Sequence, residues 1–254
     1  MLEYFMEQER KTLKHYWCED FSKDDCIFVK SGRKAIEEGL KLLKSKSVAL
    51  PSYTCERVLK AVLDAGCKPH IVDCNYDLQI DLNSLSTFKG DTVIVPHMFG
   101  IRVDIKKIKN MGYNVIEDCS QCLGLDGLGK YSDVVVVSTG NTKWLPVGGG
   151  GLLLCDNCDN IKRLDDIDLL RKLNSMTRTI KDRLKKRKSF STELLNAGVP
   201  LIGTDCDNAW MRAMYFTDKQ KRVPYTPIHE LYGDFKCPLV DGYKNKLDWI
   251  SIFA

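Results

Sequence analysis

Three groups in this sequence have the types and positions to act together: a lysine, a carboxylate and a serine-glycine turn. Lys143 stands in the segment STGNTKWLPVGGGG, after an apolar run and before four glycines. Asp118 stands in NVIEDCSQ, directly after another apolar run, and Ser31, Gly32 and Arg33 come just before a stretch with helical periodicity. A lysine amine forms imines with carbonyls, a carboxylate holds a proton on a ring nitrogen, and the N–H groups that begin a helix bind phosphate.

Pyridoxal-phosphate (PLP) chemistry requires this combination: an imine-forming lysine, an acid against the pyridine nitrogen and donors around the phosphate. Ser138, upstream of Lys143 in the same segment, adds a hydroxyl donor for that phosphate. Each signal alone also has a plain structural reading, since Lys143 fits the surface of a glycine-rich turn and Asp118 fits a helix cap. The glycines at 148–151 are better explained by a turn of close approach than by a nucleotide-binding loop, because no Gly-Lys-Ser/Thr follows them.

The elements that must position these residues alternate between short apolar runs and amphipathic stretches, as in an α/β fold. Gly66 and Gly112 fall where helix C-caps belong. The pattern predicts a mainly parallel, seven-stranded type of sheet with helices on both sides and a small α/β C-terminal region. Lys143 and Asp118 both follow strands, at the edge where open α/β sheets bind ligands. We expect strands at 47–50, 69–72, 92–96, 114–117, 134–138 and 151–155, and helices at 33–44, 56–65 and 104–110.

The pattern changes after Asp156, where charge density rises and apolar periodicity weakens. Residues 159–188 favour a polar helix, and the proline-containing tail at 223–254 favours short strands and turns. We therefore place a domain boundary near 156, with a PLP-binding large domain at 1–156 and a reduced C-terminal domain at 157–254.

Several segments match one family in its order: SGRKAI, LPSYTCERVLKAVLDAGCKPHIVD, VIVPHMFG, NVIEDCSQCLG and S-x4-KWLPVGGGG. Over about residues 27–155 the sequence resembles the DegT-type sugar aminotransferases, which are fold-type I PLP enzymes, with a fainter match in the tail. The resemblance implies that Lys143 is the Schiff-base lysine, that Asp118 contacts the pyridine nitrogen and that Gln121 contacts the 3-hydroxyl side of the cofactor. It further implies phosphate contacts from Ser138, Gly32 and Arg33.

The sequence departs from this family at several positions. Cys55 stands where many members place an aromatic ring on the cofactor, and Tyr53 nearby would point elsewhere in an extended segment. Arg33 replaces a more usual threonine, and the C-terminal region is shorter than in typical members. His229, in VPYTPIH, stands in the place of a substrate-side histidine. His97, in VPHMFG, is either a substrate ligand or a hydrogen-bonded structural residue.

The resemblance implies an aminotransferase that moves an amino group from glutamate to a keto sugar carried on a nucleotide, in polysaccharide or amino-sugar biosynthesis. It also implies a homodimer. Related PLP dehydratases have histidine at the position of Lys143, so the lysine favours amination. The departures leave open a degenerate relative that binds PLP or a sugar nucleotide without turnover.

Composition is that of an ordinary globular protein, with 44% hydrophobic and 28% charged residues. The formal charge of +4 is small for 254 residues, so we expect no nucleic-acid or membrane partner. A basic stretch at 178–188 favours a solvated helix face or loop, although it could contact phosphates or an acidic partner. The first residues lack the apolar centre of a secretory signal, which predicts a cytoplasmic protein.

Eleven cysteines are scattered along the chain, and in the cytoplasm we expect most of them to be reduced. Two pairs, Cys119 with Cys122 and Cys155 with Cys158, have the spacing of zinc ligands. Structural zinc is therefore a rival hypothesis. The first pair begins within the EDCSQ motif and the gap between the pairs is longer than in zinc ribbons, so we predict no metal.

Overall fold

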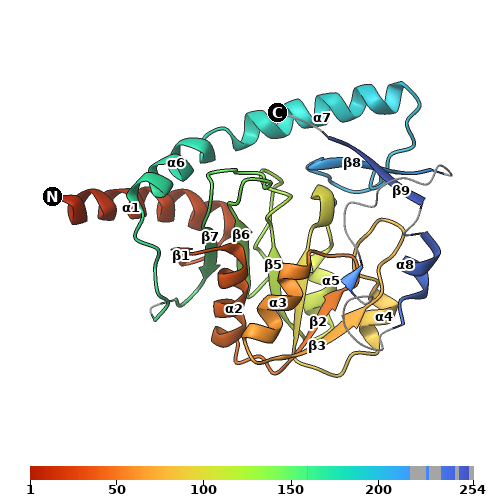
Figure 1. Cartoon of the computed structure of the whole chain (residues 1–254), viewed down its shortest axis with the longest axis horizontal. Coiled ribbons are helices and arrows are strands. Elements are labelled where there is room, and N and C mark those ends of the chain that lie inside the picture. Colours follow the sequence, from red (N-terminus) through yellow and green to blue (C-terminus); the bar gives the residue numbers. More distant parts are fainter. Residues whose placement is uncertain (159, 218–226, 229–235, 244–245, 252–254) are drawn as a thin grey trace.

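The chain is built around a seven-stranded sheet in the computed structural model, which describes all residues except 159, 218–226, 229–235, 244–245 and 252–254 (Figure 1). The strand order is β1-β7-β6-β5-β4-β2-β3. Strands β2 to β6 run parallel to their neighbours within that group, and β7 is antiparallel to both β6 and β1. The mainly parallel α/β fold predicted from the sequence is confirmed. The strands are β1 (Asp25–Val29), β2 (Ser47–Pro51), β3 (Lys68–Val72), β4 (Thr92–Pro96), β5 (Asn114–Asp118), β6 (Val134–Ser138) and β7 (Gly151–Cys155).

Both faces of the sheet are covered, which explains why its strands are almost continuous apolar runs. On one face, Ile94, Ile116 and Val136 lie in a core cluster with α2 (Gly32–Leu42) and α3 (Glu56–Asp64). The other face holds two clusters. One contains α1, α6 and α7 over β1, β7 and β6, and the second contains α4 and α5 over β2, β4 and β5. These helices are α1 (Leu2–Phe21), α4 (Leu82–Ser86), α5 (Ile105–Asn110), α6 (Ile167–Thr177) and α7 (Ile180–Asn196).

Local signals start and end these helices as expected. The side chain of Ser31 caps α2 by accepting the N–H of Lys34 at 3.1 Å. Gly66 and Gly112 follow α3 and α5 with φ of 74° and 92°, a left-handed conformation that glycine adopts without steric cost. These two glycines were predicted at these positions from the sequence.

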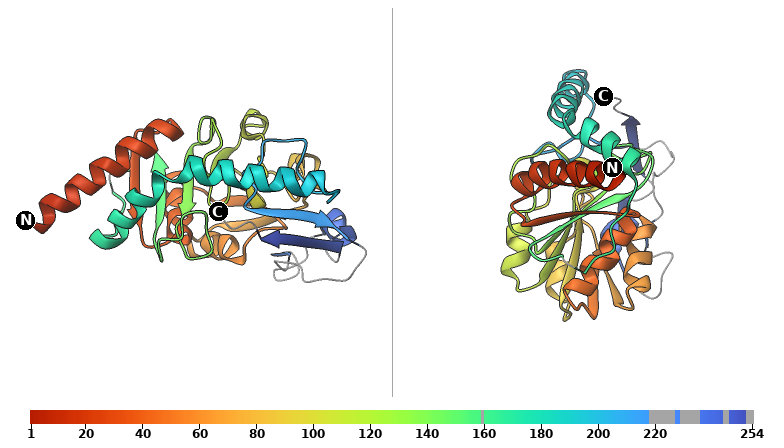
Figure 2. Two further views of the ribbon diagram at one scale, coloured as in Figure 1. Left: turned by 90° about the horizontal axis from the view of Figure 1, so that it is seen from above. Right: turned by 90° about the vertical axis from the view of Figure 1, so that its left-hand side faces the viewer.

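Described residues after residue 156 share core clusters with the strands of the sheet (Figure 2). Helix α7 runs across the top of the molecule in Figure 1, and α6 contacts α1. Strands β8 (Arg212–Phe216) and β9 (Leu247–Ser251) form an antiparallel pair, and α8 (Pro238–Tyr243) begins where Asp73 accepts the N–H groups of Leu239 and Val240 at 2.7 and 3.1 Å. A division near residue 156 stays a prediction.

Three sequence expectations need correction. The predicted polar helix at 159–188 is two helices, α6 and α7, and α6 starts only at Ile167, where Asp166 caps it. Helix α1 and strand β1 were not predicted, because α1 reads as a polar segment and β1 is short. The tail contains a helix, α8, as well as the strand β9. None of the described helices is long and apolar enough to cross a bilayer.

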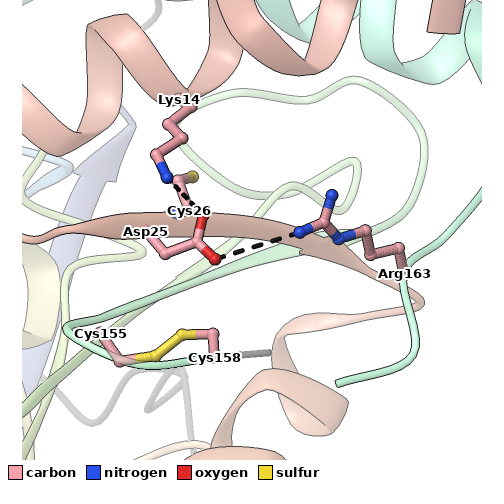
Figure 3. Close-up of a disulfide and its surroundings, with 6 residues drawn as sticks. All are labelled: Lys14, Asp25, Cys26, Cys155, Cys158 and Arg163. Carbon is pink, nitrogen blue, oxygen red and sulfur yellow. Dashed lines mark hydrogen bonds and ion pairs between the residues drawn. A yellow bond between two sulfur atoms is a disulfide. The ribbon is translucent and has the colours of Figure 1, made fainter. Parts of the chain in front are cut away.

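A disulfide joins Cys155, at the end of β7, to Cys158 just after it (Figure 3). Next to them, Asp25 at the start of β1 forms ion pairs with Lys14 at 3.4 Å and Arg163 at 4.0 Å. The other nine cysteines form no disulfide.

Candidate active site

A pocket of about 180 Å³ lies where α2 and α3 begin and where β5 and β6 end. This is the carboxyl edge of the parallel strands, where the sequence placed the ligand site. The structure brings six of the predicted site residues together in its wall: Gly32, Arg33, Cys55, Asp118, Ser138 and Lys143.

One end of the pocket is formed by the start of α2 and the end of β6. Gly32 is packed so closely that a Cβ atom added to it would lie 2.5 Å from Cβ of Ser138. A side chain at residue 32 would therefore push the helix away from the strand. The absence of one brings the first N–H groups of α2 close to the Ser138 hydroxyl, a combination that suits an anion.

Asp118 closes another side of the pocket, at the end of β5. Its Oδ1 accepts the N–H of Ser120 at 2.9 Å, and Oγ of Ser120 accepts the N–H of Ser138 at 2.8 Å. These bonds fix the carboxylate of Asp118 relative to β6 and use only one of its oxygens. Ser120 lines the pocket as well and was not predicted, although its place two residues after Asp118 is that of a local Asp turn.

Lys143 reaches the pocket from the loop between β6 and β7. Its N–H donates to the carbonyl of Gly140 at 3.0 Å, which makes a tight turn after the strand. The side chain is half-buried, and Asp118 is the only carboxylate among the described residues that line the pocket. The pocket therefore holds an amine and an acid on neighbouring elements.

Sequence reasoning missed two further polar residues of the wall, Arg57 and Thr142. Arg57 lies in the first turn of α3, is exposed, and has no carboxylate within ion-pair distance in the described part of the chain. Cys55 is the N-cap residue of α3 and makes no side-chain cap bond. Tyr53 is directed elsewhere, as expected, and is fully buried with its ring 6.0 Å from that of Phe99.

Gln121 is not among the described residues that line the pocket, so the cofactor contact that the resemblance implies for it stays a prediction. Its Oε1 accepts the N–H of Phe99 at 3.0 Å, and its Nε2 contacts Sδ of Met98 at 3.6 Å. Phe99 has a φ of 59°, an unfavourable conformation for a residue with a large side chain. Gln121 thus stabilises the turn of η1 (Met98–Gly100) after β4.

His97 is also not among the described residues that line the pocket, and its two hydrogen bonds favour the structural alternative, while a substrate contact stays a prediction. Its Nδ1 accepts the N–H of Val103 at 3.0 Å, and its Nε2 lies 2.9 Å from Oε1 of Glu117. The first bond requires Nε2 to carry the proton that is donated to Glu117. Burial raises the pKa of the Glu117 carboxyl, but hydrogen bonds from His97, Ser132 and the Gly129 N–H outweigh burial and lower it.

The same histidine lies near Cys119 and Cys122, and potential ligand atoms of the three are within 4.8 Å of one another. A metal would need a lone pair on a histidine nitrogen, but Nδ1 is used by Val103 and Nε2 by its own proton. The two Cys-x-x-Cys pairs also belong to core clusters on opposite faces of the sheet, so they do not meet in one four-cysteine site. These observations argue against zinc here. His229, the last predicted site residue, lies outside the described residues.

Comparison with known proteins gives the fold and the pocket a context. The model of the DegT/DnrJ/EryC1/StrS aminotransferase family matches residues 8–183. The 3-oxo-glucose-6-phosphate:glutamate aminotransferase of Bacillus subtilis (strain 168) is 30% identical over 171 residues, which is 63% of this chain and 38% of that protein. The chain thus spans about two fifths of the length of this curated relative.

Solved structures agree with this match. NtdA of Bacillus subtilis, solved with bound cofactor PMP, has a TM-score of 0.69 at 25% identity. The match covers 84% of this chain and 58% of the NtdA chain. A DegT DnrJ EryC1 StrS aminotransferase from Brucella abortus has a TM-score of 0.81 at 16% identity, with coverage of 97% and 88%, and shows the likeness of the fold. Because the family model matches well over half of the sequence, the chain belongs to the DegT/DnrJ/EryC1/StrS aminotransferase family.

Proposed function

We propose that this chain is a PLP-dependent aminotransferase that moves an amino group from glutamate to a keto sugar. The observation that carries the proposal is the pocket that brings Lys143, Asp118, Ser138 and the start of α2 together. Family membership and the glutamate aminotransferase from Bacillus subtilis support the same reaction class.

The donor set of the pocket fits PLP. The phosphate of PLP would lie at Ser138 and the first turn of α2, where Gly32 leaves room for close approach. Oδ2 of Asp118, which accepts no hydrogen bond from the described residues, would face the pyridine nitrogen. Ile36, Val58 and Val136 would supply apolar contacts for the ring. PLP, when bound, supplies a carbonyl that exchanges amines and a ring that withdraws electrons from the bonds to be broken.

The residues of this chain would then have separate tasks. Lys143 would hold the cofactor through Nζ and afterwards act as the base that moves a proton at Nζ. The carboxylate of Asp118 would keep the ring nitrogen protonated through a charge-assisted hydrogen bond. The hydroxyl of Ser138 and the N–H groups of α2 would orient the phosphate without transferring a proton.

Charge in the pocket supports an anionic substrate. Arg33, Arg57 and Lys143 line it, and Asp118 is the one carboxylate among its described lining residues. Our sequence interpretation is a sugar carried on a nucleotide, and the curated relative is named for a sugar phosphate. Arg57 suits the phosphate of either substrate because its guanidinium has no ion-pair partner in the described residues. Polysaccharide or amino-sugar biosynthesis, a cytoplasmic location, a homodimer and a division into domains at residue 156 belong to this proposal.

A single-turnover experiment tests the proposed reaction. Glutamate added to the PLP-loaded protein should convert the cofactor to pyridoxamine phosphate, seen as loss of the visible band and release of 2-oxoglutarate. Nucleotide-linked keto sugars and keto-sugar phosphates, added next, should restore the band for one of the two classes. A band that no amino donor changes would refute the aminotransferase. It would favour the second candidate, a PLP- or sugar-nucleotide-binding relative, which the cysteine at 55 in place of an aromatic ring suggests.

A further inference from the structure

The loop that carries Lys143 is attached to the opposite side of the sheet by the next residue. Lys143 lines the pocket on the α2 and α3 face. Trp144 is only 1% exposed and belongs, with Leu145 and Val147, to the core cluster that α1, α6 and α7 form on the other face. The position of Lys143 therefore depends on how firmly Trp144 is held.

A buried arginine of α7 holds the tryptophan ring. Arg187 is 7% exposed, and its Cζ lies 4.7 Å from the centroid of the Trp144 ring, which is a cation–π contact. Its Nη1 also donates to the carbonyls of Trp210 and Met211 at 3.2 and 3.1 Å. No carboxylate of the described residues lies within 4.0 Å of this guanidinium.

Such an environment is unusual for a cation. Burial, and then the nearby charge of Arg183, lower the pKa of Arg187 to about 10, so it stays charged at neutral pH. Carbonyl dipoles and the face of the indole ring are the groups that compensate for its lost hydration. The arginine is thus built into the fold around Trp144 rather than lying on a solvated face.

A second arginine, one turn earlier on the same face of α7, holds the backbone of the same residue. Arg183 donates from Nη1 to the carbonyl oxygen of Trp144 at 3.2 Å and from Nε to the hydroxyl of Thr179 at 3.1 Å. Residues four apart on a helix lie on one face, so Arg183 and Arg187 reach the loop together. Helix α7 thereby fixes both the ring and the carbonyl of the residue that follows Lys143.

We propose that Arg187 is a positioning residue for Lys143 and acts through the ring of Trp144. The inference rests on the proposed function for its catalytic consequence, but the positioning of the loop is a property of the protein without cofactor. Small displacements of a reacting group cost large factors in rate, so a loosened Trp144 slows the capture of PLP by Lys143. Binding of the phosphate at α2 and Ser138 does not depend on this contact.

The test compares Arg187→Met, which keeps bulk without charge, with Arg187→Lys, which keeps the charge. Lys186→Met is the matched control, because Lys186 is the preceding residue of α7 and is exposed. The first readout uses the apoprotein. Endoproteinase Lys-C should cut after Lys143 at least tenfold faster in Arg187→Met than in the parent, while cleavage at other lysines stays within twofold.

The second readout uses PLP. In Arg187→Met the visible band should form at least tenfold more slowly, which corresponds to about 1.4 kcal/mol, while the affinity for inorganic phosphate stays within twofold. Arg187→Lys should recover more than half of both effects, and Lys186→Met should match the parent. Folded Arg187→Met with parent-like cleavage and band formation would overturn the inference. If that variant does not fold, the same contact is tested by changing the ring: Trp144→Leu removes the aromatic face, and Trp144→Phe keeps one.

The two proposals fail in different ways. A parent protein that never forms a visible band with PLP contradicts the proposed function and leaves the Lys-C comparison to decide the role of Arg187. A parent that forms the band, with Arg187→Met unchanged in both readouts, contradicts the positioning role alone.

Discussion

Replacing Asp118 by asparagine changes one oxygen of the pocket and little else. In the structure Oδ1 of Asp118 accepts the N–H of Ser120 at 2.9 Å. Asparagine keeps that bond only by presenting its carbonyl oxygen to Ser120, and its NH₂ group then takes the place of Oδ2. The variant would then present a hydrogen-bond donor to the pyridine nitrogen, whereas the parent presents a charged acceptor.

The size of the effect follows from the bond that is lost. A hydrogen bond to a charged group contributes about 1.5–3 kcal/mol, and the new donor adds repulsion against a protonated ring nitrogen. Each 1.36 kcal/mol in the barrier is about tenfold in rate. We therefore expect Asp118→Asn to slow the half-reaction with glutamate by roughly 10²-fold or more, with PLP retained because the Lys143 and phosphate contacts are unchanged.

Rapid mixing of PLP-loaded protein with glutamate, followed at the visible band, measures this rate directly. Asp126→Asn is the control, since it makes the same change at a carboxylate that is 97% exposed. A variant that retains PLP and reacts at the parent rate would show that Asp118 is a structural acid at a strand end. The cofactor would then lie elsewhere than we propose.

Two further predictions concern the support of the pocket. Gly32→Ala places a Cβ atom 2.5 Å from Cβ of Ser138, so we expect a loss of about 1–3 kcal/mol in unfolding free energy and weaker PLP binding, both measurable by urea titration and by absorbance. Glu117 has a lowered pKa in the fold, so its carboxylate stabilises the protein above the ordinary glutamate pKa and loses this contribution as the pH falls through the folded value. Urea unfolding of Glu117→Gln should show a deficit of about 1.5–3 kcal/mol at neutral pH that shrinks below about pH 4, and a deficit independent of pH would contradict the pairing with His97.

The sheet could be predicted well because its strands are buried on both faces. Short, continuous apolar runs such as TVIVP and VVVVS are typical of strands that are buried on both faces. Gly66 and Gly112 mark helix ends because they adopt a left-handed conformation that few other residues adopt. Strand β1 was not predicted because it is only five residues long and begins with the charged Asp25, so its apolar run is short. Helix α1 was missed because its buried residues are widely spaced among charges.

The candidate site was predictable where a residue directly follows a strand or begins a helix. Asp118, Ser138 and Lys143 reach one pocket because the carboxyl ends of parallel strands meet at one edge. His97 and Gln121 also follow strands, but their side chains are consumed by hydrogen bonds that no local pattern reveals.

The basic stretch shows the limit of charge as a guide to exposure. The prediction of a solvated helix face holds for Lys185 and Lys186, which are exposed on α7. It is wrong for Arg187, which lies on a buried stripe with Ile180, Leu184 and Ser191. The spacing of that stripe is helical, and its arginine is accepted because a tryptophan ring and two carbonyls lie opposite it.

The most direct test of the account is to find which lysine PLP modifies. The protein is loaded with PLP, reduced with borohydride, digested and sequenced by mass spectrometry. We predict a pyridoxyl group on Lys143, with the label and the visible band both lost in Lys143→Ala. A label on another lysine, or a parent protein that takes up no PLP at all, would contradict the assignment of this pocket as a PLP site.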